Sequence, residues 1–432
     1  MKILVITDVL WRNDNGVGNS YSNIFSGMPN AEIANICCQE GESDNTVSKV
    51  CFQMSERRLL ANLCNKNIST GVIEIAQKKE ETQVHNDRTS NLIRSLKKSR
   101  LQVLFWLRNL IWKIGSWKSD ELRSFIDDFK PDLIFAQLQD KMYMNSIVYY
   151  VQEYTQCPLV LYAWDDVYSL KQFSFSPLFW IDRVLQRRSI RKLVRKCRKL
   201  YTISLEQKKE YAQSLHIETA LLYKGKNFTP KAKDTCIKDN VLQFVYTGNL
   251  YSGRYDTILS LCRELKTQNA TGIKAQFHIF SGTDLTDKQI EKLNIGNSSF
   301  FDGAVSEKEV EKLQRTADVL VHIEPLSLKG SLICRLSFST KLVDYFYNAK
   351  CVFAIGSDRC ASIKYLKRND AAIIATSIDE AKHRLSEILY SDTIVKEYSE
   401  KSWNCGERNH QIKTIQNDLY KDFEHIVRGS NK

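Results

Sequence analysis

Residues 1–25 read MKILVITDVLWRNDNGVGNSYSNIF, and this opening stretch contains the unit from which the fold is built. The apolar run Lys2–Thr7 predicts a buried strand, residues 14–20 predict a glycine-containing turn, and residues 19–25 predict a helix. A short strand, a turn and a helix in this order are typical of a parallel sheet with crossover helices. The sequence therefore predicts an α/β fold.

The same unit recurs in two series along the chain. The first series predicts further strands at Glu32–Cys37, Asp132–Ala136, Leu159–Tyr162, Lys199–Ile203 and Thr219–Leu222. The second series predicts strands at Leu242–Thr247, Ala275–Phe280, Ser299–Phe301, Val319–Ile323, Cys351–Ile355 and Ala371–Ala375. Residues 43–86 are polar and irregular by comparison, and we interpret them as an insertion.

A chain of 432 residues is too long for one ordinary core, so two series imply two domains. We predict Rossmann-like domains at residues 1–225 and 241–405, joined by a polar linker at 226–240. A C-terminal helix within 406–432 is expected to pack back on the first domain. In doubly wound sheets ligands bind beyond the carboxyl ends of the strands, which directs attention to the turns that face the cleft between the domains.

The composition limits the functional classes. Apolar residues make up 43% of the chain, which fits a globular protein. The 12 cysteines form no CxxC pair, and many lie in apolar segments, which is typical of buried thiols in a reducing compartment. The start of the sequence does not resemble a signal peptide, and no apolar run is long enough to span a bilayer. We therefore expect a cytoplasmic location.

In each of the two series, a glycine-containing turn follows the first strand. Gly16 and Gly18 precede a helix, and Gly248 follows the strand Leu242–Thr247. Glycine lets the backbone approach a ligand closely, and the helix start beyond each turn favours an anion. Arg254 is expected to add a charge-assisted contact to a phosphate. The alternative for the first segment is a plain strand-to-helix turn, and the alternative for the second is a common loop.

Residues 337–345, SFSTKLVDY, are the strongest candidate for a phosphate site. Ser339 and Thr340 suit the first position of a helix, where backbone N–H groups lack partners within the helix. Lys341 supplies a positive charge in the first turn, and Asp344, three residues later, lies on the same face. A carboxylate there can accept both hydroxyls of a ribose. The alternative is a helix start with an exposed Lys–Asp pair.

Acidic residues follow two other predicted strands. Glu324 ends Val319–Ile323 and is a candidate ligand for a sugar hydroxyl, while the neighbouring His322 suits a packed core position equally well. Asp165 and Asp166 follow Leu159–Tyr162 and stand beside Trp164. An aromatic face stacks on sugars, and a carboxylate orients or deprotonates a hydroxyl. An acidic helix start capped by Asp166 is the alternative.

The positive charge is uneven. The net charge is +12, and residues 1–224 carry 32 Lys and Arg against 24 Asp and Glu. Residues 101–117 combine tryptophans with Arg108 and Lys113, and residues 183–199 hold nine basic residues and no acid. Basic amphipathic helices with tryptophan bind anionic membrane surfaces. A core-packed helix with a solvated basic face is the alternative.

The order of these segments resembles that of the GT-B glycosyltransferases, particularly bacterial family 4 and its relatives in surface polysaccharide assembly. The segments are MKILVITD…NGVGNSYSNI, KCRKLYTISLEQKKEYAQSLHIETALLYKG, FVYTGNL, FHIFSG, FFDGAVSEKEVEKLQRTADVLVHIEP and SFSTKLVDYFYNAKCVFAIG. They cover most of the chain outside residues 43–130. The resemblance implies two Rossmann-like domains facing each other across a cleft. It also implies transfer of a sugar, in the manner of hexosyltransferases (EC 2.4), from a nucleotide-diphosphate sugar to a glycan or lipid-linked acceptor in capsule or O-antigen assembly.

By position, the resemblance implies that the first domain binds the acceptor and the second binds the donor. The donor-binding residues expected from these arguments are Gly248, Asn249, Arg254, Ser339, Thr340, Lys341 and Asp344. The expected catalytic residues are Asp165, Asp166 and Glu324, and those on the acceptor side are Gly16, Gly18 and Trp164. Cationic side chains and helix starts can stabilise a departing diphosphate, so we expect neither a metal nor a cofactor beyond the sugar nucleotide.

The chain departs from family 4 because a second glutamate does not follow at the usual spacing of eight; the aligned acid is Asp344, twenty positions after Glu324. Both stereochemical outcomes therefore stay open: a retaining reaction assisted by phosphate on Lys341, or an inverting one with Asp165 or Asp166 as base. A non-catalytic sugar-nucleotide-binding or scaffold subunit is a further alternative. Nucleic-acid binding is suggested by the charge alone, but no RNA or DNA module is visible, so no nucleic-acid partner is expected.

Overall fold

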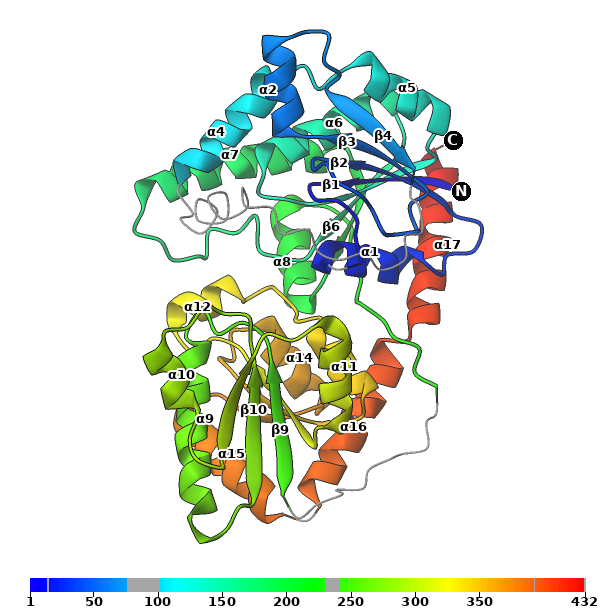
Figure 1. Ribbon diagram of the computed structural model, residues 1–432. Coiled ribbons are helices and arrows are strands. Elements are labelled where there is room, and N and C mark those ends of the chain that lie inside the picture. The colour runs from blue at the N-terminus through cyan, green and yellow to red at the C-terminus, as the bar shows by residue number, and fades with distance from the viewer. Residues whose placement is uncertain (14, 76–101, 230–240, 392, 431–432) are drawn as a thin grey trace.

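The computed structural model describes residues 1–432 except 14, 76–101, 230–240, 392 and 431–432. The described chain forms two α/β domains, which lie one above the other in Figure 1. The sheet of the first domain has the spatial order β4 (Gly71–Ile75), β3 (Val50–Met54), β2 (Glu32–Cys37), β1 (Lys2–Thr7), β5 (Leu133–Gln137), β6 (Leu159–Ala163), β7 (Cys197–Thr202), β8 (Thr219–Leu221). The sheet of the second has the order β11 (Ser299–Gly303), β10 (Ala275–Phe280), β9 (Leu242–Thr247), β12 (Val319–Ile323), β13 (Cys351–Ile355), β14 (Ile373–Ala375).

Both sheets are doubly wound. Within the described residues every neighbouring pair of strands is parallel except β3 and β4, which are antiparallel. In the first sheet the strand order reverses between β1 and β5, and in the second it reverses between β9 and β12. Ligands of such sheets bind at this reversal, beyond the carboxyl ends of the strands. The predicted α/β fold with two Rossmann-like domains is therefore confirmed.

Helices cover both faces of each sheet. Those of the first domain are α1 (Gly16–Phe25), α2 (Glu56–Cys64), α4 (Gln102–Ile114), α5 (Asp120–Phe129), α6 (Met142–Thr155), α7 (Pro177–Val194) and α8 (Leu205–Leu215). Those that follow are α9 (Arg254–Gln268), the short η1 (Asn269–Thr271), α10 (Asp287–Leu293), α11 (Glu307–Thr316), α12 (Leu328–Ile333), α13 (Lys341–Tyr347), α14 (Ala361–Asn369), α15 (Ile378–Tyr390), α16 (Ile394–Asn409) and α17 (Ile412–Ser430).

The apolar run of β1 shows why the sheet forms the centre of the first domain. Ile3 and Val5 point to one face, where they join a core that includes α1 and α17, while Leu4 and Ile6 point to the other face, where α4 to α7 pack. All four side chains are completely buried. A strand buried on both faces lacks the polar alternation of a surface strand, which is why the sequence shows it as one continuous apolar run.

The interpretation of residues 43–86 as an irregular insertion is wrong for its described part. This stretch contains β3, α2 and β4, which extend the first sheet beyond β2, and residues 76–86 lie outside the described residues. Both strands have only five residues, and β4 is an edge strand whose Ile73 and Ile75 are exposed. Short edge strands leave a weak pattern in the sequence, so local propensity gave no clear signal there.

The chain crosses between the domains twice, and the two crossings lie side by side. The N–H of Lys226 donates to the carbonyl of His410, and the N–H of Ile412 donates to the carbonyl of Lys226. The ring of His410 is buried, and burial lowers its pKa to about 4. Its neutral ring therefore donates from Nδ1 to the carbonyl of Lys224 at 2.9 Å and accepts at Nε2 from Tyr365 at 2.8 Å. Of the predicted linker 226–240, residues 230–240 lie outside the described residues.

Helix α17 returns to the first domain after the second crossing, as Figure 1 shows. Its Phe423 is completely buried and packs against Phe135 of β5 and Tyr201 of β7 at ring-centroid distances of 5.9 and 6.2 Å. Its Asp422 accepts a hydrogen bond from Lys199 at 2.9 Å. The last helix of the chain thus completes the core of the first domain.

Phe423→Ala should lower the free energy of unfolding by about 3–5 kcal/mol, because it leaves a cavity between α17 and the first sheet. Lys421→Ala, an exposed position on the same helix, is the control and should change stability by less than about 0.5 kcal/mol. Denaturant unfolding followed by circular dichroism measures both. Equal stability of the two variants would show that α17 contributes little to this core.

Candidate active site

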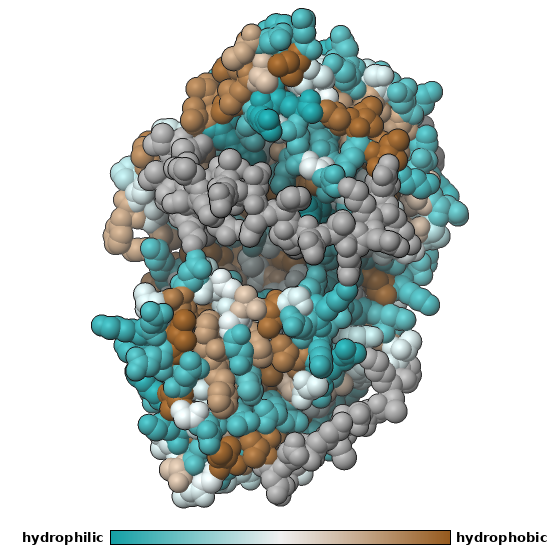
Figure 2. Space-filling model, viewed as in Figure 1, coloured by the Kyte–Doolittle hydropathy of each residue, from teal (hydrophilic) through white to brown (hydrophobic). Residues whose placement is uncertain are grey.

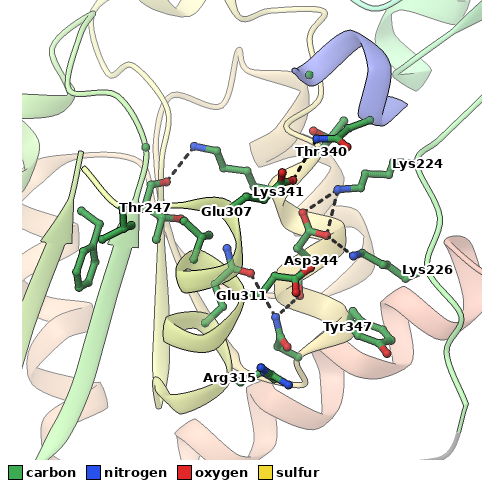
Figure 3. Close-up of a pocket in the computed structure, with 18 of the residues that line it drawn as sticks. Lys224, Lys226, Thr247, Glu307, Glu311, Arg315, Thr340, Lys341, Asp344 and Tyr347 are labelled. Carbon is green, nitrogen blue, oxygen red and sulfur yellow. Dashed lines mark hydrogen bonds and ion pairs between the residues drawn. The ribbon is translucent and has the colours of Figure 1, made fainter. Parts of the chain in front are cut away.

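A cavity of about 880 Å³ opens between the two domains. It lies at the carboxyl ends of β9 and β10, next to the reversal of strand order in the second sheet. One wall comes from α1 of the first domain, and the others come from the turns after β9, β10 and β11 and from α11 and α13. We name it the donor-side cavity after the sequence prediction for its residues, and Figure 3 shows the charged residues that line it.

Lys341, at the start of α13, points across the cavity toward the end of β9 (Figure 3). Its Nζ donates a hydrogen bond to the carbonyl of Thr247 at 2.9 Å. A Cβ on Gly248 would lie only 2.7 Å from this Nζ, so glycine is needed for the ammonium group to occupy its place. Burial, followed by the charge of Arg254, lowers the pKa of Lys341. An ammonium group has three hydrogens, and a bound anion would offset this effect and favour the charged form.

A second group of charges comes from the first interdomain crossing. Lys224 and Lys226 both reach Asp344 of α13, at 2.9 and 3.3 Å between nitrogen and carboxylate oxygen. All three residues line the cavity, and Figure 3 shows the carboxylate of Asp344 between the two ammonium groups. These ion pairs join the crossing to the second domain and place two more cations beside the cavity.

The opposite wall is one face of α11. Glu307, Glu311 and Arg315 follow at intervals of four residues and all line the cavity. Asn19 of α1 donates to the carboxylate of Glu307 at 3.1 Å, which links the two domains across the cavity. Residues four apart share a face of a helix, so this spacing is the sequence signal that would have identified the wall.

The start of α13 differs in detail from the sequence prediction. Thr340 occupies the first position, but its backbone is already helical and its side chain makes no capping hydrogen bond. The N–H of Ser339 donates to the hydroxyl of Ser362 at 3.0 Å. Ser339 lines neither this cavity nor the neighbouring one, which is described after it. The predicted capping by Ser339 and Thr340 is therefore wrong. Thr340 still lines the cavity, although its side chain does not cap the helix.

The predicted residues Asn249, Arg254 and Glu324 form one cluster behind the cavity wall. Arg254 donates to the carbonyl of Ile323 at 2.9 Å, to Asn249 at 3.2 Å and to the carboxylate of Glu324 at 3.2 Å. Burial raises the pKa of Glu324, but a hydrogen bond and the charge of His322, together with Arg254, outweigh it, so the pKa lies below the usual value.

Glu324 is thus a buried, ion-paired carboxylate, with only 5% of its surface exposed. It lies outside the lining of both cavities. This placement contradicts a direct catalytic role for Glu324, because a general acid or base must reach the reacting atoms. Instead it holds Arg254, whose charge acts on Lys341.

A second cavity of about 850 Å³ adjoins the first. Gly16, Ser20 and Thr340 line both cavities, so the two spaces share a wall. Trp164 and Asp165, from the turn after β6, line only the second one, which we name the acceptor-side cavity. This cavity also contains the polar side chains Arg12, Gln39, Gln137 and Ser337.

Asp165 meets the second domain directly. Its carboxylate accepts a hydrogen bond from Ser337 at 2.8 Å. The carboxylate is open to the cavity on one side, but the protein packed around its other sides raises its pKa, and the hydrogen bond from Ser337 offsets part of this rise. Asp165 is therefore the predicted acidic residue that remains accessible from the acceptor-side cavity.

Asp166 has a different environment, although it is the next residue in the sequence. Its side chain is completely buried and pairs with Arg335 of the second domain at 3.1 Å. Its carboxylate also accepts from the N–H and hydroxyl of Ser169. A buried carboxylate with these partners cannot reach a substrate, so the prediction of Asp166 as a base is wrong. It anchors the second domain on the first.

The anchor extends along the chain on both sides of Arg335. Arg335 also pairs with Glu210 of α8, and the carbonyl of Leu336 accepts from Ser204 at 2.6 Å. Leu336 is completely buried within the core of the first domain. A loop of the second domain is thus inserted into the first, and it ends at Ser337, beside Asp165.

Gly18 has a packing role. A Cβ at this position would lie 1.8 Å from the carbonyl oxygen of Arg12, so only glycine fits beneath that loop. Gly18 lines neither cavity, which corrects its prediction as an acceptor-side residue, whereas Gly16 lines both. In the described part of the chain no group of three His, Cys, Asp or Glu side chains is placed to hold a metal ion.

No protein-family model and no curated protein matches the chain. Solved structures do, at low identity. HepE of Anabaena, crystallised with UDP, shares 12% identity and a TM-score of 0.62 over 98% of this chain and 100% of HepE. Sucrose-phosphate synthase of Thermosynechococcus elongatus shares 11% identity and a TM-score of 0.61 over 99% and 100% of the two chains. WaaG, a glycosyltransferase involved in lipopolysaccharide biosynthesis, shares 10% identity and a TM-score of 0.57 over 97% of this chain and 99% of WaaG.

These likenesses establish the class of fold: two Rossmann-like domains that face each other across a cleft, as in the GT-B proteins. HepE has also been crystallised with UDP-glucose, with a TM-score of 0.60 to this chain. The donor-side cavity lies at the reversal of strand order in the second sheet, which is where this class of sheet binds ligands.

Arg335→Ala should destabilise the protein by about 3–5 kcal/mol, because it leaves the buried carboxylate of Asp166 without its cation. Arg368→Ala removes a more exposed interdomain ion pair with Glu206 and should cost less than about 1 kcal/mol. Thermal unfolding of both variants measures the difference. If both variants unfold at the same temperature as the parent, the inserted loop does not hold the domains together.

Proposed function

We propose that the protein is a glycosyltransferase that moves a sugar from a nucleotide-diphosphate sugar to a glycan or lipid-linked acceptor. The observation that carries the proposal is the ammonium of Lys341, held by the carbonyl of Thr247 in the space left by Gly248 at the wall of an interdomain cavity. A cation held at the reversal of strand order and open to a cavity is suited to a diphosphate. HepE, which has the same fold, binds UDP and UDP-glucose.

Four charged residues around the donor-side cavity suit the parts of a sugar nucleotide. Lys341 would neutralise the diphosphate as it leaves the sugar, which lowers the barrier to transfer without a metal. Lys224 and Lys226 add positive charge at the same wall. Asp344, which now accepts from these lysines, would accept the hydroxyls of the ribose. The nucleotide base and the sugar are not assigned.

The shared wall of the two cavities favours transfer over simple binding. Because Gly16, Ser20 and Thr340 line both spaces, a donor in one and an acceptor in the other would lie against each other. Holding two reactants in this way supplies a large part of the rate enhancement of a transferase. The indole of Trp164 would stack on an acceptor sugar, and the carboxylate of Asp165 would accept a hydrogen bond from the attacking hydroxyl.

The setting of the reaction is part of the proposal. We place the enzyme in the cytoplasm, because all 11 cysteines in the described part are free and seven of them are buried. No described helix is long and apolar enough to cross a membrane. The likeness to WaaG supports a role in surface polysaccharide assembly, such as that of capsule or O-antigen.

Lys341→Ala and Gly248→Ala should each weaken binding of the preferred nucleoside diphosphate by an order of magnitude or more. The first removes a contact to a charged group worth about 1.5–3 kcal/mol, and the second displaces the same ammonium. Gly282→Ala is the matched control: Gly282 lines the same cavity, but its added Cβ would meet Ala304 at an ordinary 3.7 Å.

The preferred diphosphate is found first by thermal shift with a panel of nucleoside diphosphates, since a ligand of the folded state raises the melting temperature. Affinity is then measured by calorimetry, and turnover by release of the nucleotide from its sugar conjugate with acceptor present. Gly248→Ala binding as tightly as Gly282→Ala would show that Lys341 does not bind the diphosphate. Tight binding without any turnover would identify a non-catalytic subunit.

The rate of transfer should fall at acid pH as Asp165 becomes protonated, and it should fall at a higher pH than for an ordinary carboxylate, because the pKa of Asp165 is raised. Ser337→Ala removes a hydrogen bond that lowers this pKa. The acid limb of the kcat profile should therefore move to higher pH in Ser337→Ala and return in Ser337→Thr, which restores a hydroxyl. An unchanged profile in Ser337→Ala would exclude Asp165 from the reaction.

A further inference from the structure

Helix α4 presents an unusually apolar face to solvent. Leu107, Leu110 and Ile114 are 51%, 50% and 55% exposed. Their spacing of three and four residues places them on one side of the helix. The other sides of α4 are engaged: Trp112 is buried in the core, and Arg108 pairs with Glu56 of α2. The exposed apolar residues therefore form a stripe, while Arg108 and Trp112 bind the helix to the domain.

Helix α7 carries a second stripe of the same kind. Leu178, Ile181 and Val184 are 42%, 52% and 44% exposed and follow at intervals of three residues. The indole of Trp106 in α4 donates to the carboxylate of Asp182 in α7 at 3.3 Å, so the two helices lie side by side. Figure 1 shows α2, α4 and α7 in succession at the outer edge of the first domain, and Figure 2 shows hydrophobic side chains on that edge.

We name this surface the apolar face and define it by Leu60 and Leu63 of α2 and by the two stripes. Leu60 and Leu63 are 44% and 37% exposed. Single exposed apolar residues are common on soluble proteins, but exposed apolar residues gathered on three neighbouring helices are typical of a surface that meets a partner or a membrane.

The charges beside the apolar face identify the partner. The sequence of α4 contains no acidic residue, and that of α7 contains only Asp182, which is buried. By contrast, α4 and the C-terminal half of α7 expose lysine and arginine, at Lys113, Arg188, Arg191 and Lys192. A second copy of the chain would bring like charges together at this face. The surface of a bilayer with anionic lipids offers both the apolar interior and the opposite charge.

The apolar face continues toward the acceptor-side cavity. Residues 166–176 connect Asp165, which lines that cavity, to the start of α7. This connection exposes Leu170, Phe173 and Phe175 by 51%, 44% and 89%. The rings of Phe173 and Phe175 pack edge to face at 4.7 Å on the surface of the domain. An apolar path thus leads from the edge of the cavity to α7.

We propose that the apolar face inserts into the surface of an anionic membrane, with residues 170–175 placing the acceptor-side cavity next to the lipid. The acceptor is then a sugar carried on a lipid, whose head enters the cavity while its chain stays in the bilayer. The identity of the acceptor rests on the proposed function. The binding of the membrane does not, because it requires neither the donor nor the cavity.

The test is co-sedimentation of the full chain with vesicles of phosphatidylcholine alone and of phosphatidylcholine mixed with phosphatidylglycerol. The protein should bind the mixed vesicles and bind the neutral ones more weakly. Leu110→Glu combined with Ile181→Glu should reduce binding about tenfold or more, because each buried apolar side chain contributes to insertion. Ile273→Glu, which changes an apolar residue of the second domain that is 42% exposed, should bind like the parent.

Nucleoside diphosphate binding, measured by thermal shift on the same variants, separates this inference from the proposed function. Both variants should keep it. If the parent protein binds the vesicles but binds no nucleoside diphosphate, only the proposed glycosyltransferase function is overturned. Vesicle binding that is absent in the parent, or unchanged in Leu110→Glu with Ile181→Glu, would overturn the inference. The inference would also be overturned if light scattering shows that the parent is a dimer and the double variant is a monomer. A second copy of the chain would then occupy the apolar face.

Discussion

The ammonium of Lys341 at the carbonyl of Thr247 is the interaction on which the rest of the site depends. It joins the start of α13 to the end of β9, on either side of the reversal of strand order in the second sheet. Gly248 leaves the space that the ammonium occupies. Behind this wall Arg254 and Glu324 form an ion pair, so of these three charged residues only Lys341 lines the cavity. Acidic and basic residues of both sides of the cleft line the same cavity as this cation.

Contacts between the domains keep the two cavities against each other. The loop at Leu336 is inserted into the first domain, Asp344 pairs with Lys224 and Lys226, and Asn19 reaches Glu307. The two chain crossings pair with each other near His410, which stays uncharged at neutral pH because burial lowers its pKa to about 4. The donor side, the acceptor side and the apolar face therefore belong to one connected arrangement, in which the membrane would lie on the side of the acceptor.

Much of the fold could be predicted from the sequence because the central strands, such as Lys2–Thr7, are buried on both faces and appear as continuous apolar runs. The strands Val50–Met54 and Gly71–Ile75 could not, because both have only five residues and the second is an exposed edge strand that lacks a continuous apolar run. For the site, the sequence indicated which turns lie at the strand ends but not which side chains face the cavity. Asp165 and Asp166 are adjacent in the sequence, yet one is accessible and the other is buried by Arg335, which lies 169 positions further along the chain. Such pairings depend on how the two domains meet, and local patterns carry no information about it.

The central claim is that Lys341 binds a diphosphate in the donor-side cavity. A crystal structure of the protein with the nucleoside diphosphate that binds most tightly tests it most directly. We expect diphosphate oxygens within hydrogen-bond distance of Lys341 Nζ and beside Gly248, with the ribose near Asp344. A diphosphate bound elsewhere on the chain, with Lys341 still in contact only with protein, would contradict it.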